Sequence, residues 1–291
     1  MASSTHEFAT DKIGWPRGRW LRWRHRVPAS FGVAAVLVLV AIGAAWLAPY
    51  NPYQEHVTLR DALQPPSLHH WLGTDQLGRD VFSRILFGGR VSLGLGIFAV
   101  SIAASLGSAS GLFGGYRGGW WDHALMRVVD ALQAFPTLIL AIGITAVIGT
   151  GVVGVTVAIG VVTIPIFARL ARARVLQVRT LDYVEAAHAV GASGVRTMAR
   201  CILPNVAGPL IVQASVSLSF AILIEAGLSF LGLGVQPPTP SWGNMINEGK
   251  EFLEQAPWLV FAPGGMIFVT VMTFNFLGDA MRDRLDRAGP A

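Results

Sequence analysis

DYVEAAHAVGASGVRTMARCILPNV, residues 182–206, is a polar interruption in a chain that is otherwise strongly apolar. It contains an alanine-rich segment, a glycine, a basic segment and then Leu203-Pro204. The runs on either side carry almost no charge over about 20 residues each, which is the length that crosses a bilayer. The pattern predicts a compact helix–turn–helix on the water-facing side of a membrane protein, and the rest of the fold follows from where this turn lies.

The composition indicates a chain that is largely solvated by lipid. Of its 291 residues, 53% are hydrophobic and 13% are charged, and the mean hydropathy is +0.53. Soluble domains carry about 25% charged residues. The net charge of +5 is distributed over short segments between apolar runs, which argues against nucleic acid as a partner. The single cysteine, Cys201, excludes a disulfide within the chain.

Six apolar runs predict an all-α, polytopic membrane helix bundle with six transmembrane helices. The first run has no convincing cleavage site, so we expect it to be retained as an anchor. The third and fifth runs each contain one acidic residue, Asp130 and Glu225. The predicted spans are 29–48, 92–113, 125–148, 152–168, 207–229 and 258–278.

The distribution of basic residues predicts the orientation. With both termini inside, 17 of the 22 lysine and arginine residues lie in inside segments and 5 in outside segments. The positive-inside rule therefore favours an N-in, C-in protein of the bacterial plasma membrane. The expected divisions are a basic cytoplasmic tail (1–28), the first transmembrane helix (29–48), an external segment with an amphipathic helix (49–90), a core (91–280) containing the cytoplasmic loop 180–205, and a cytoplasmic tail (281–291).

The external segments offer two local predictions. Residues 74–90 place Leu77, Val81 and Ile85 on one helical face and Arg79, Asp80 and Arg84 on the other, with Asp80 and Arg84 spaced to pair. An amphipathic helix at the membrane surface is expected there. In the second external segment, 230–257, Ser241 is expected to cap a short helix.

Small residues recur every four positions in the second span, at Ala99, Ala103, Gly107 and Gly111. This spacing lets a neighbouring helix approach closely. Ordinary helix packing is the favoured interpretation, and a moving seam along a translocation path is the alternative.

The sequence contains no motif that would place catalysis on this chain. Lys250 stands in NEGKE, without the glycine spacing of a phosphate-binding loop, and HExxH and CxxC are absent. Asp130 and Glu225 are candidates for a gate or a translocation path because acids at membrane depth are costly. A structural ion pair or hydrogen bond would explain them equally well.

The interruption at 182–206 has recognisable helix signals. Asp182 and Glu185 have the spacing of a capping box, Gly191 suits a left-handed stop, and Ser193 is placed to cap the next helix. Pro204 ends that helix or begins the fifth span. The resulting turn is too small to bury a core of its own, and its alanines suit insertion into a groove of another protein.

Glu185-Ala186-Ala187, Gly191 and Leu203-Pro204 resemble the EAA signature of ABC-importer permeases. Cys201 departs from the family pattern, in which this position is often aliphatic or histidine. The resemblance implies that the loop docks into a cleft of a separate ATPase. The residues it assigns to this coupling are Asp182, Glu185, Ala186, Ala187, Gly191, Arg196, Leu203 and Pro204, with Arg200 as a further polar neighbour.

Three further segments narrow the resemblance. LGTDQLGRDVFSRILFGGRVSL (72–93), DALQAFPTLIL (130–140) and EAGLSFLGLGVQPPTPSWG (225–243) are similar to the C-type permease of the dipeptide/oligopeptide/nickel subfamily. The resemblance implies a related B-type permease, two ATPase subunits or one fused ATPase, and an external solute-binding protein as partners. It implies that ATP and Mg are bound by the ATPases and that this chain carries no cofactor. Peptides are the expected cargo; nickel chelates and glutathione-like molecules stay open.

Two other function classes compete with this interpretation. A secondary transporter or channel would use Asp130 or Glu225 and would work without an ATPase. A membrane-embedded enzyme would need a catalytic constellation, which the sequence does not offer.

Overall fold

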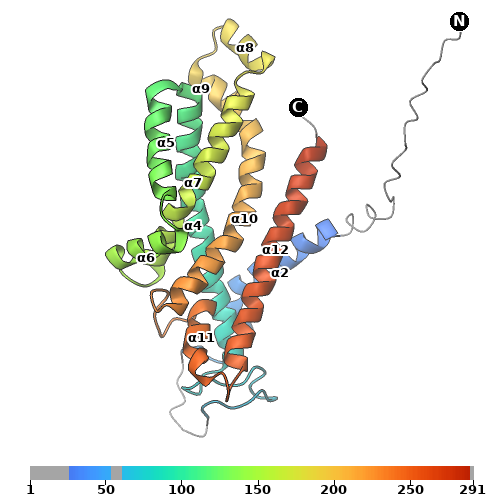
Figure 1. Cartoon of the computed structure of the whole chain (residues 1–291). Helices are drawn as coiled ribbons and strands as arrows, with labels where there is room; N and C mark the ends of the chain where they lie inside the picture. The colour runs from blue at the N-terminus through green and yellow to red at the C-terminus, as the bar shows by residue number, and fades with distance from the viewer. Residues whose placement is uncertain (1–25, 54–60, 289–291) are drawn as a thin grey trace, which may run out of the picture.

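The computed structural model describes residues 26–53 and 61–288, and these residues form helices joined by loops (Figure 1). Most of the predicted basic tail, and residues 289–291 of the second tail, lie outside the described residues. The helices are α2 (Arg26–Ile42), α3 (Ala44–Leu47), α4 (Val81–Arg117), α5 (Gly119–Gln133), α6 (Thr137–Ile148), α7 (Val152–Val178), α8 (Asp182–Ala189), α9 (Gly194–Thr197), α10 (Leu203–Phe230), α11 (Trp242–Gly249) and α12 (Trp258–Ala288), with a π-helical turn at Met198–Ile202 and a 3₁₀ turn at Lys250–Phe252.

The predicted spans all fall on helices, but they are not alike. Within the described residues, four helices are long and apolar enough to cross a membrane, and α5 with α6 forms a fifth candidate. The first run is shorter than expected, because its apolar helix covers only 29–42 before a break at Gly43. α12 continues past 280, where the core was expected to end, as far as Ala288.

The third span is the clearest departure from the prediction. Residues 125–148 do not form one straight helix, because α5 and α6 meet at an angle of 94°. Pro136 lies at the break, where its ring removes a backbone donor and restricts Phe135 to extended conformations. α6 consequently leaves the side of the bundle, as Figure 1 shows.

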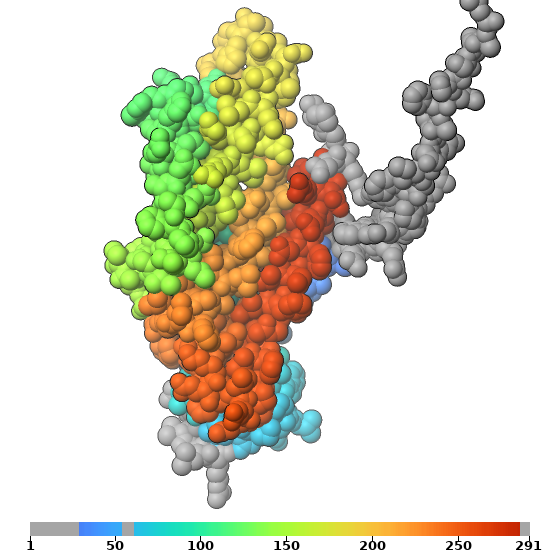
Figure 2. All heavy atoms as spheres, viewed as in Figure 1, coloured from blue at the N-terminus to red at the C-terminus, as the bar shows by residue number. Residues whose placement is uncertain are grey.

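The two ends of the bundle differ in character. In Figures 1 and 2, α8 and the C-terminal end of α12 lie toward one end of an elongated molecule, and α11 lies at the other. Of the described residues, α8 and the end of α12, both predicted to be cytoplasmic, thus lie toward one end, and α11, predicted to be external, lies at the other.

The edge of small residues on α4 is buried against α7. Ala99 and Ala103 have no exposed surface. A Cβ on Gly107 would stand 2.6 Å from the Ile164 carbonyl oxygen, and one on Gly111 would stand 2.2 Å from that of Ala168. Backbones this close leave no space for a side chain, so this edge serves close helix packing, as the favoured interpretation expected.

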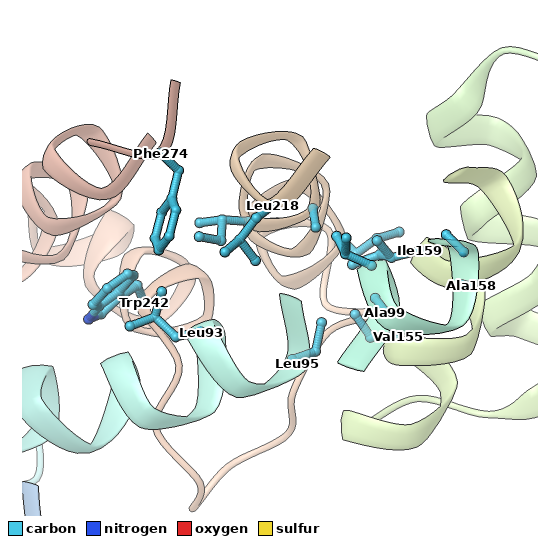
Figure 3. Packing of buried hydrophobic residues seen from close by; sticks show 14 of the residues in the cluster. Leu93, Leu95, Ala99, Val155, Ala158, Ile159, Leu218, Trp242 and Phe274 are labelled. Atoms are coloured by element: carbon cyan, nitrogen blue, oxygen red, sulfur yellow. The ribbon is translucent and has the colours of Figure 1, made fainter. Parts of the chain in front are cut away.

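In the main hydrophobic core, α2, α6, α7, α11 and α12 pack around α4 and α10 (Figure 3). Leu218 of α10 and Phe274 of α12 lie on one side, and Ile159 of α7 lies on the other. Trp242 of α11 is fully buried there, and its indole nitrogen donates to the carbonyl of Ile85 at 3.0 Å. The core therefore ties α11 firmly to the spanning helices.

The external segment before α4 does not form the expected amphipathic helix. Residues 74–80 form turns and a short bridge between Thr74 and Asp80, and the helix begins at Val81. Asp80 caps it, since its carboxylate accepts from the Ser83 amide at 2.8 Å. Asp80 does not pair with Arg84 but lies 3.0 Å from His70 Nδ1.

The polar face predicted for this segment is buried. Arg79 and Arg84 are at most 2% exposed, and both contact the carboxylates of Asp75 and Glu248. We call these four residues the outer ion cluster. It joins the external loop and α4 to α11, so residues 169 positions apart are held together. Glu248, in the second external segment, thus belongs to this cluster.

Candidate functional site

The turn between α7 and α10 projects from the cytoplasmic end of the bundle (Figure 1). We call residues 181–197, which include α8 and α9, the cytoplasmic turn. Its first helix carries Asp182 and Glu185 in the first turn and His188 in the last, which suits the helix dipole. The two short helices predicted from the sequence are thus present.

The predicted capping details are only partly confirmed. Leu181, not Asp182, is the N-cap of α8, and no side-chain cap bond forms. The capping box fails because Asp182 is itself the first helical residue. Ser193 does occupy the N-cap position of α9, but its carbonyl rather than its hydroxyl is the group bound by the Thr197 amide, at 2.9 Å.

Gly191 has the expected left-handed conformation, with φ +81°. Its amide donates to the His188 carbonyl at 2.9 Å, and the Ala192 amide donates to the Ala187 carbonyl at 3.0 Å. No atom lies within 4 Å of the place where a Cβ would stand. Backbone conformation alone therefore favours glycine here, and the space around it is open.

The surface of the cytoplasmic turn is largely exposed and partly apolar. Glu185 and Ala186 are exposed and Ala187 is half-buried. Val190 is 85% exposed and Val195 is 82% exposed. These two valines were missed by the sequence analysis, although their position on either side of Gly191 could have indicated them. Apolar side chains presented to water in this way are typical of a contact surface.

A small hydrophobic core anchors the turn to the spanning helices. Val184 of α8 is 1% exposed and faces the bundle. It belongs to a cluster with residues of α7, the π-helical turn and α10: Ala171, Val175, Val178, Ile202 and Val206. Movement of α8 must therefore carry these helix ends with it.

Pro204 explains the π-helical turn that follows α9. Proline has no amide hydrogen, and its ring clashes with the carbonyl four residues earlier, so the regular α-helical pattern is broken. The amide of Leu203 donates to Met198, five residues back. Pro204 lies in the first turn of α10, as one of the two predicted alternatives had it. π-helical turns occur frequently at functional sites.

Polar side chains stabilise this irregular turn and connect it to α8. Asn205 Nδ2 donates to the Cys201 carbonyl at 2.8 Å and to the Tyr183 hydroxyl at 3.0 Å. The Tyr183 hydroxyl in turn donates to the Cys201 carbonyl at 3.3 Å. Arg196 and Arg200 are exposed on the same end of the molecule. None of these three polar contacts was predicted, and the two that involve Tyr183 join residues 18 and 22 positions apart.

The two membrane-depth acids lie in different surroundings. Asp130 of α5 accepts from Arg169 of α7 at 2.6 Å, at the edge of an open hollow. Glu225 of α10 has no exposed surface. Its carboxylate accepts from Ser229 and Ser241 at 2.8 Å each and from Ser92 at 3.3 Å. Ser241 also caps α11 as predicted, so Glu225 links α10, α4 and α11.

A bundle of spanning helices with an exposed, anchored turn at one end has the features of a transport permease. Comparison with known families agrees. The profile of the "Binding-protein-dependent transport system inner membrane component" family matches residues 103–288, and this chain belongs to that family. The profile "N-terminal TM domain of oligopeptide transport permease C" matches residues 19–66. The protein is thus an ABC-importer permease subunit of the inner membrane and not itself an enzyme.

Individual relatives place it within the dipeptide/oligopeptide subfamily. It is 43% identical over 271 residues to the glutathione transport system permease protein GsiD of Escherichia coli O6:K15:H31 (strain 536 / UPEC), covering 92% of this chain and 88% of that one. The GsiD protein of Shigella boydii serotype 4 (strain Sb227) gives the same values.

Solved structures support the fold. Two inward-facing crystal forms of the MetNI methionine ABC transporter match with TM-scores of 0.58 and 0.56. The sequence identity is 18% in both cases, over 72% of this chain and 97% and 98% of those chains.

Proposed function

We propose that this permease imports small peptides or peptide-like solutes and is driven through its cytoplasmic turn by separate ATPase subunits. It pairs with a related permease and receives cargo from an external solute-binding protein; ATP and Mg are bound by the ATPases. The observation that carries the proposal is the geometry of the turn. Glu185, Ala186, Val190 and Val195 are exposed on the turn, while buried Val184 packs against residues of α7, the π-helical turn and α10.

The same geometry supports the mechanism. A docked ATPase would bind the exposed side of α8. When the two ATPase subunits close on ATP, they would displace α8 and, through the small core, the α7 and α10 residues packed against it. Gly191, Arg196, Leu203 and Pro204 shape or flank the gripped segment, and Asp182 begins it. Glutathione, a tripeptide named in the relatives' function, is a cargo of the proposed class.

The test is a change that alters the surface without disturbing the fold of this subunit. Ala186 is exposed, so Ala186→Trp introduces no internal clash but would obstruct a groove that receives α8. We expect the variant to assemble with its partner permease, to lose most binding of the ATPases and to lose ATP-driven uptake. The measurements are copurification of each subunit and uptake into proteoliposomes.

Gly191→Pro tests the turn by a different route. Proline holds φ near −65°, whereas Gly191 needs +81°, so the turn must rearrange. ATP hydrolysis should be uncoupled from uptake while the protein stays in the membrane. Gly232→Pro is the matched control, because Gly232 has φ +79° and equally open surroundings but lies outside the cytoplasmic turn. Unaltered uptake by Gly191→Pro, or uptake by the permeases without any ATPase, would contradict the proposal.

A further inference from the structure

Between α5 and α7 the structure contains a hollow of about 540 Å³. Pockets that bind small molecules commonly measure about 300–1,000 Å³. Six of its lining residues are ionisable, which sets it apart from the apolar surface of the spanning helices. They are Asp122, His123, Arg127, Asp130, Arg169 and Arg172.

The position of Asp130 puts the deeper end of this hollow well inside the membrane. Trp121, near the start of α5, stacks edge-on with Phe113 near the end of α4, at 5.9 Å between ring centroids. Such aromatic residues mark the membrane–water interface. Asp130 lies nine residues further along α5, or about 14 Å at about 1.5 Å per residue. The hydrocarbon core is about 30 Å thick, so Asp130 lies in its inner half, and Arg169, one residue past the predicted span 152–168, reaches it from the cytoplasmic end of α7.

Two ion pairs join α5 to α7, and they differ in their hydrogen-bond geometry and in their exposure. Asp122 and Arg172 form two parallel bonds of 2.6 Å, with the Asp122 side chain only 10% exposed. Asp130 and Arg169 form a single bond of 2.6 Å, and their side chains are 54% and 51% exposed. The geometry of the first pair is that of a structural ion pair that holds α5 against α7. The second keeps bonding capacity on both partners.

A half-exposed ion pair in the inner half of the membrane would be costly against lipid, because its unpaired polar atoms have no solvent there. It must face water or another polar molecule. The adjacent break between α5 and α6 is the kind of discontinuity that forms solute sites at mid-membrane in transporters. An ammonium group can bond to the open oxygen of Asp130, and a carboxylate can bond to the open nitrogens of Arg169.

We propose that the α5–α7 hollow is a cargo contact site on the translocation path, which takes zwitterionic solutes with their ammonium group at Asp130 and a carboxylate at Arg169. This inference rests on the proposed function and assigns residues to its cargo. Without cargo, Asp130 and Arg169 bond to each other at the edge of the hollow; a zwitterion replaces each partner by a group of the same charge. Arg127 gives the lining a surplus of positive charge that suits solutes with a second carboxylate.

The first test measures whether water reaches the hollow. In a Cys201→Ser background, Met126→Cys places a thiol on the lining, and Val128→Cys is the matched control on the same helix outside the lining. The complete importer in inside-out vesicles is treated with a membrane-impermeant methanethiosulfonate reagent. We expect at least tenfold faster modification of Met126→Cys. Equal rates at the two positions would overturn the proposal.

The second test separates cargo binding from structural pairing. Asp130→Asn, Arg169→Gln and the reversed pair Asp130→Arg/Arg169→Asp are assayed in the reconstituted complete importer with labelled glutathione as the probe. We expect each single variant to lower uptake at least tenfold while basal ATP hydrolysis stays within twofold of wild type. The reversed pair restores the ion pair, but it places the positive charge on α5 and the negative charge on α7. The cargo's ammonium and carboxylate groups would then meet like charges, so uptake should stay low.

Recovery of uptake in the reversed pair would show that Asp130 and Arg169 serve only to hold α5 against α7, and would overturn the proposal. So would single variants that transport like the wild type. Failure of the proposed function looks different, because the wild-type importer itself would then show no ATP-dependent uptake of glutathione, and both proposals would fall.

Discussion

Replacing Asp75 with asparagine should destabilise the external end of the protein strongly. In the outer ion cluster, two buried arginines are balanced by two carboxylates. Asp75 accepts from Arg79 Nε at 2.6 Å and from Arg84, and also from the amides of Leu77 and Arg79 at 2.9 Å each. The substitution keeps the shape of the side chain but leaves one buried positive charge without a partner.

The expected loss follows from that imbalance. Breaking a buried ion pair by removing one partner costs about 3–5 kcal/mol. At about 2–4 °C per kcal/mol for domains of 150–250 residues, the Tm should fall by about 6–20 °C. The assay is thermal unfolding of the detergent-solubilised permease followed by size-exclusion chromatography.

The control is Glu251→Gln, which neutralises an exposed carboxylate in the same external end. Exposed substitutions of this kind change stability by about 0.5 kcal/mol or less, so the melting curve should hardly move. If Asp75→Asn melted within 2 °C of the wild type, on the order of 1 kcal/mol or less, the cluster would not be a source of stability and the charge-balance reasoning would be refuted.

Three further changes test other contacts. Gly111→Val should lower the Tm and the membrane yield, because its Cβ would stand 2.2 Å from the Ala168 carbonyl oxygen; normal yield would contradict the close α4–α7 packing. Tyr183→Phe removes one hydroxyl from the π-helical turn, at a cost of about 1 kcal/mol, and should lower the number of solutes imported per ATP hydrolysed more than it lowers assembly. Glu225→Leu leaves three buried hydroxyls without their acceptor, at about 1–3 kcal/mol each, whereas Glu225→Gln keeps an acceptor oxygen. Glu225→Gln should therefore be the more stable of the two in thermal unfolding, and equal stability would argue against this role.

The sequence predicted the parts of this fold that depend on local composition. Apolar runs located the spans, the basic residues set the orientation, and Gly191 and Ser241 were recognised because turn and cap chemistry is local. Residues 125–148 were predicted as one span, without the bend at Pro136. A run of apolar residues has the same hydropathy whether or not its helix changes direction, so the 94° angle left no trace in the pattern.

Features that depend on distant partners were not predictable in the same way. Periodicity placed Arg79 and Arg84 on a polar face, and a polar face normally meets water. They are buried instead because Glu248, far along the chain, compensates their charge. Asp130 was recognised as unusual, but its partner Arg169 lies 39 residues away, and only the assembled bundle shows the hollow beside them.

The helical stretch from the cytoplasmic turn to the external end is continuous over 37 residues, Gly194–Phe230. At about 1.5 Å per residue it is about 55 Å long, which exceeds the thickness of the bilayer. Such a rod behaves as a lever that pivots where neighbouring helices hold it. Displacement of its cytoplasmic end tilts the helix, so its external end, with Glu225 and the attached α11, moves in the opposite direction. Tilting of one helix can therefore transmit a conformational change from one side of the membrane to the other.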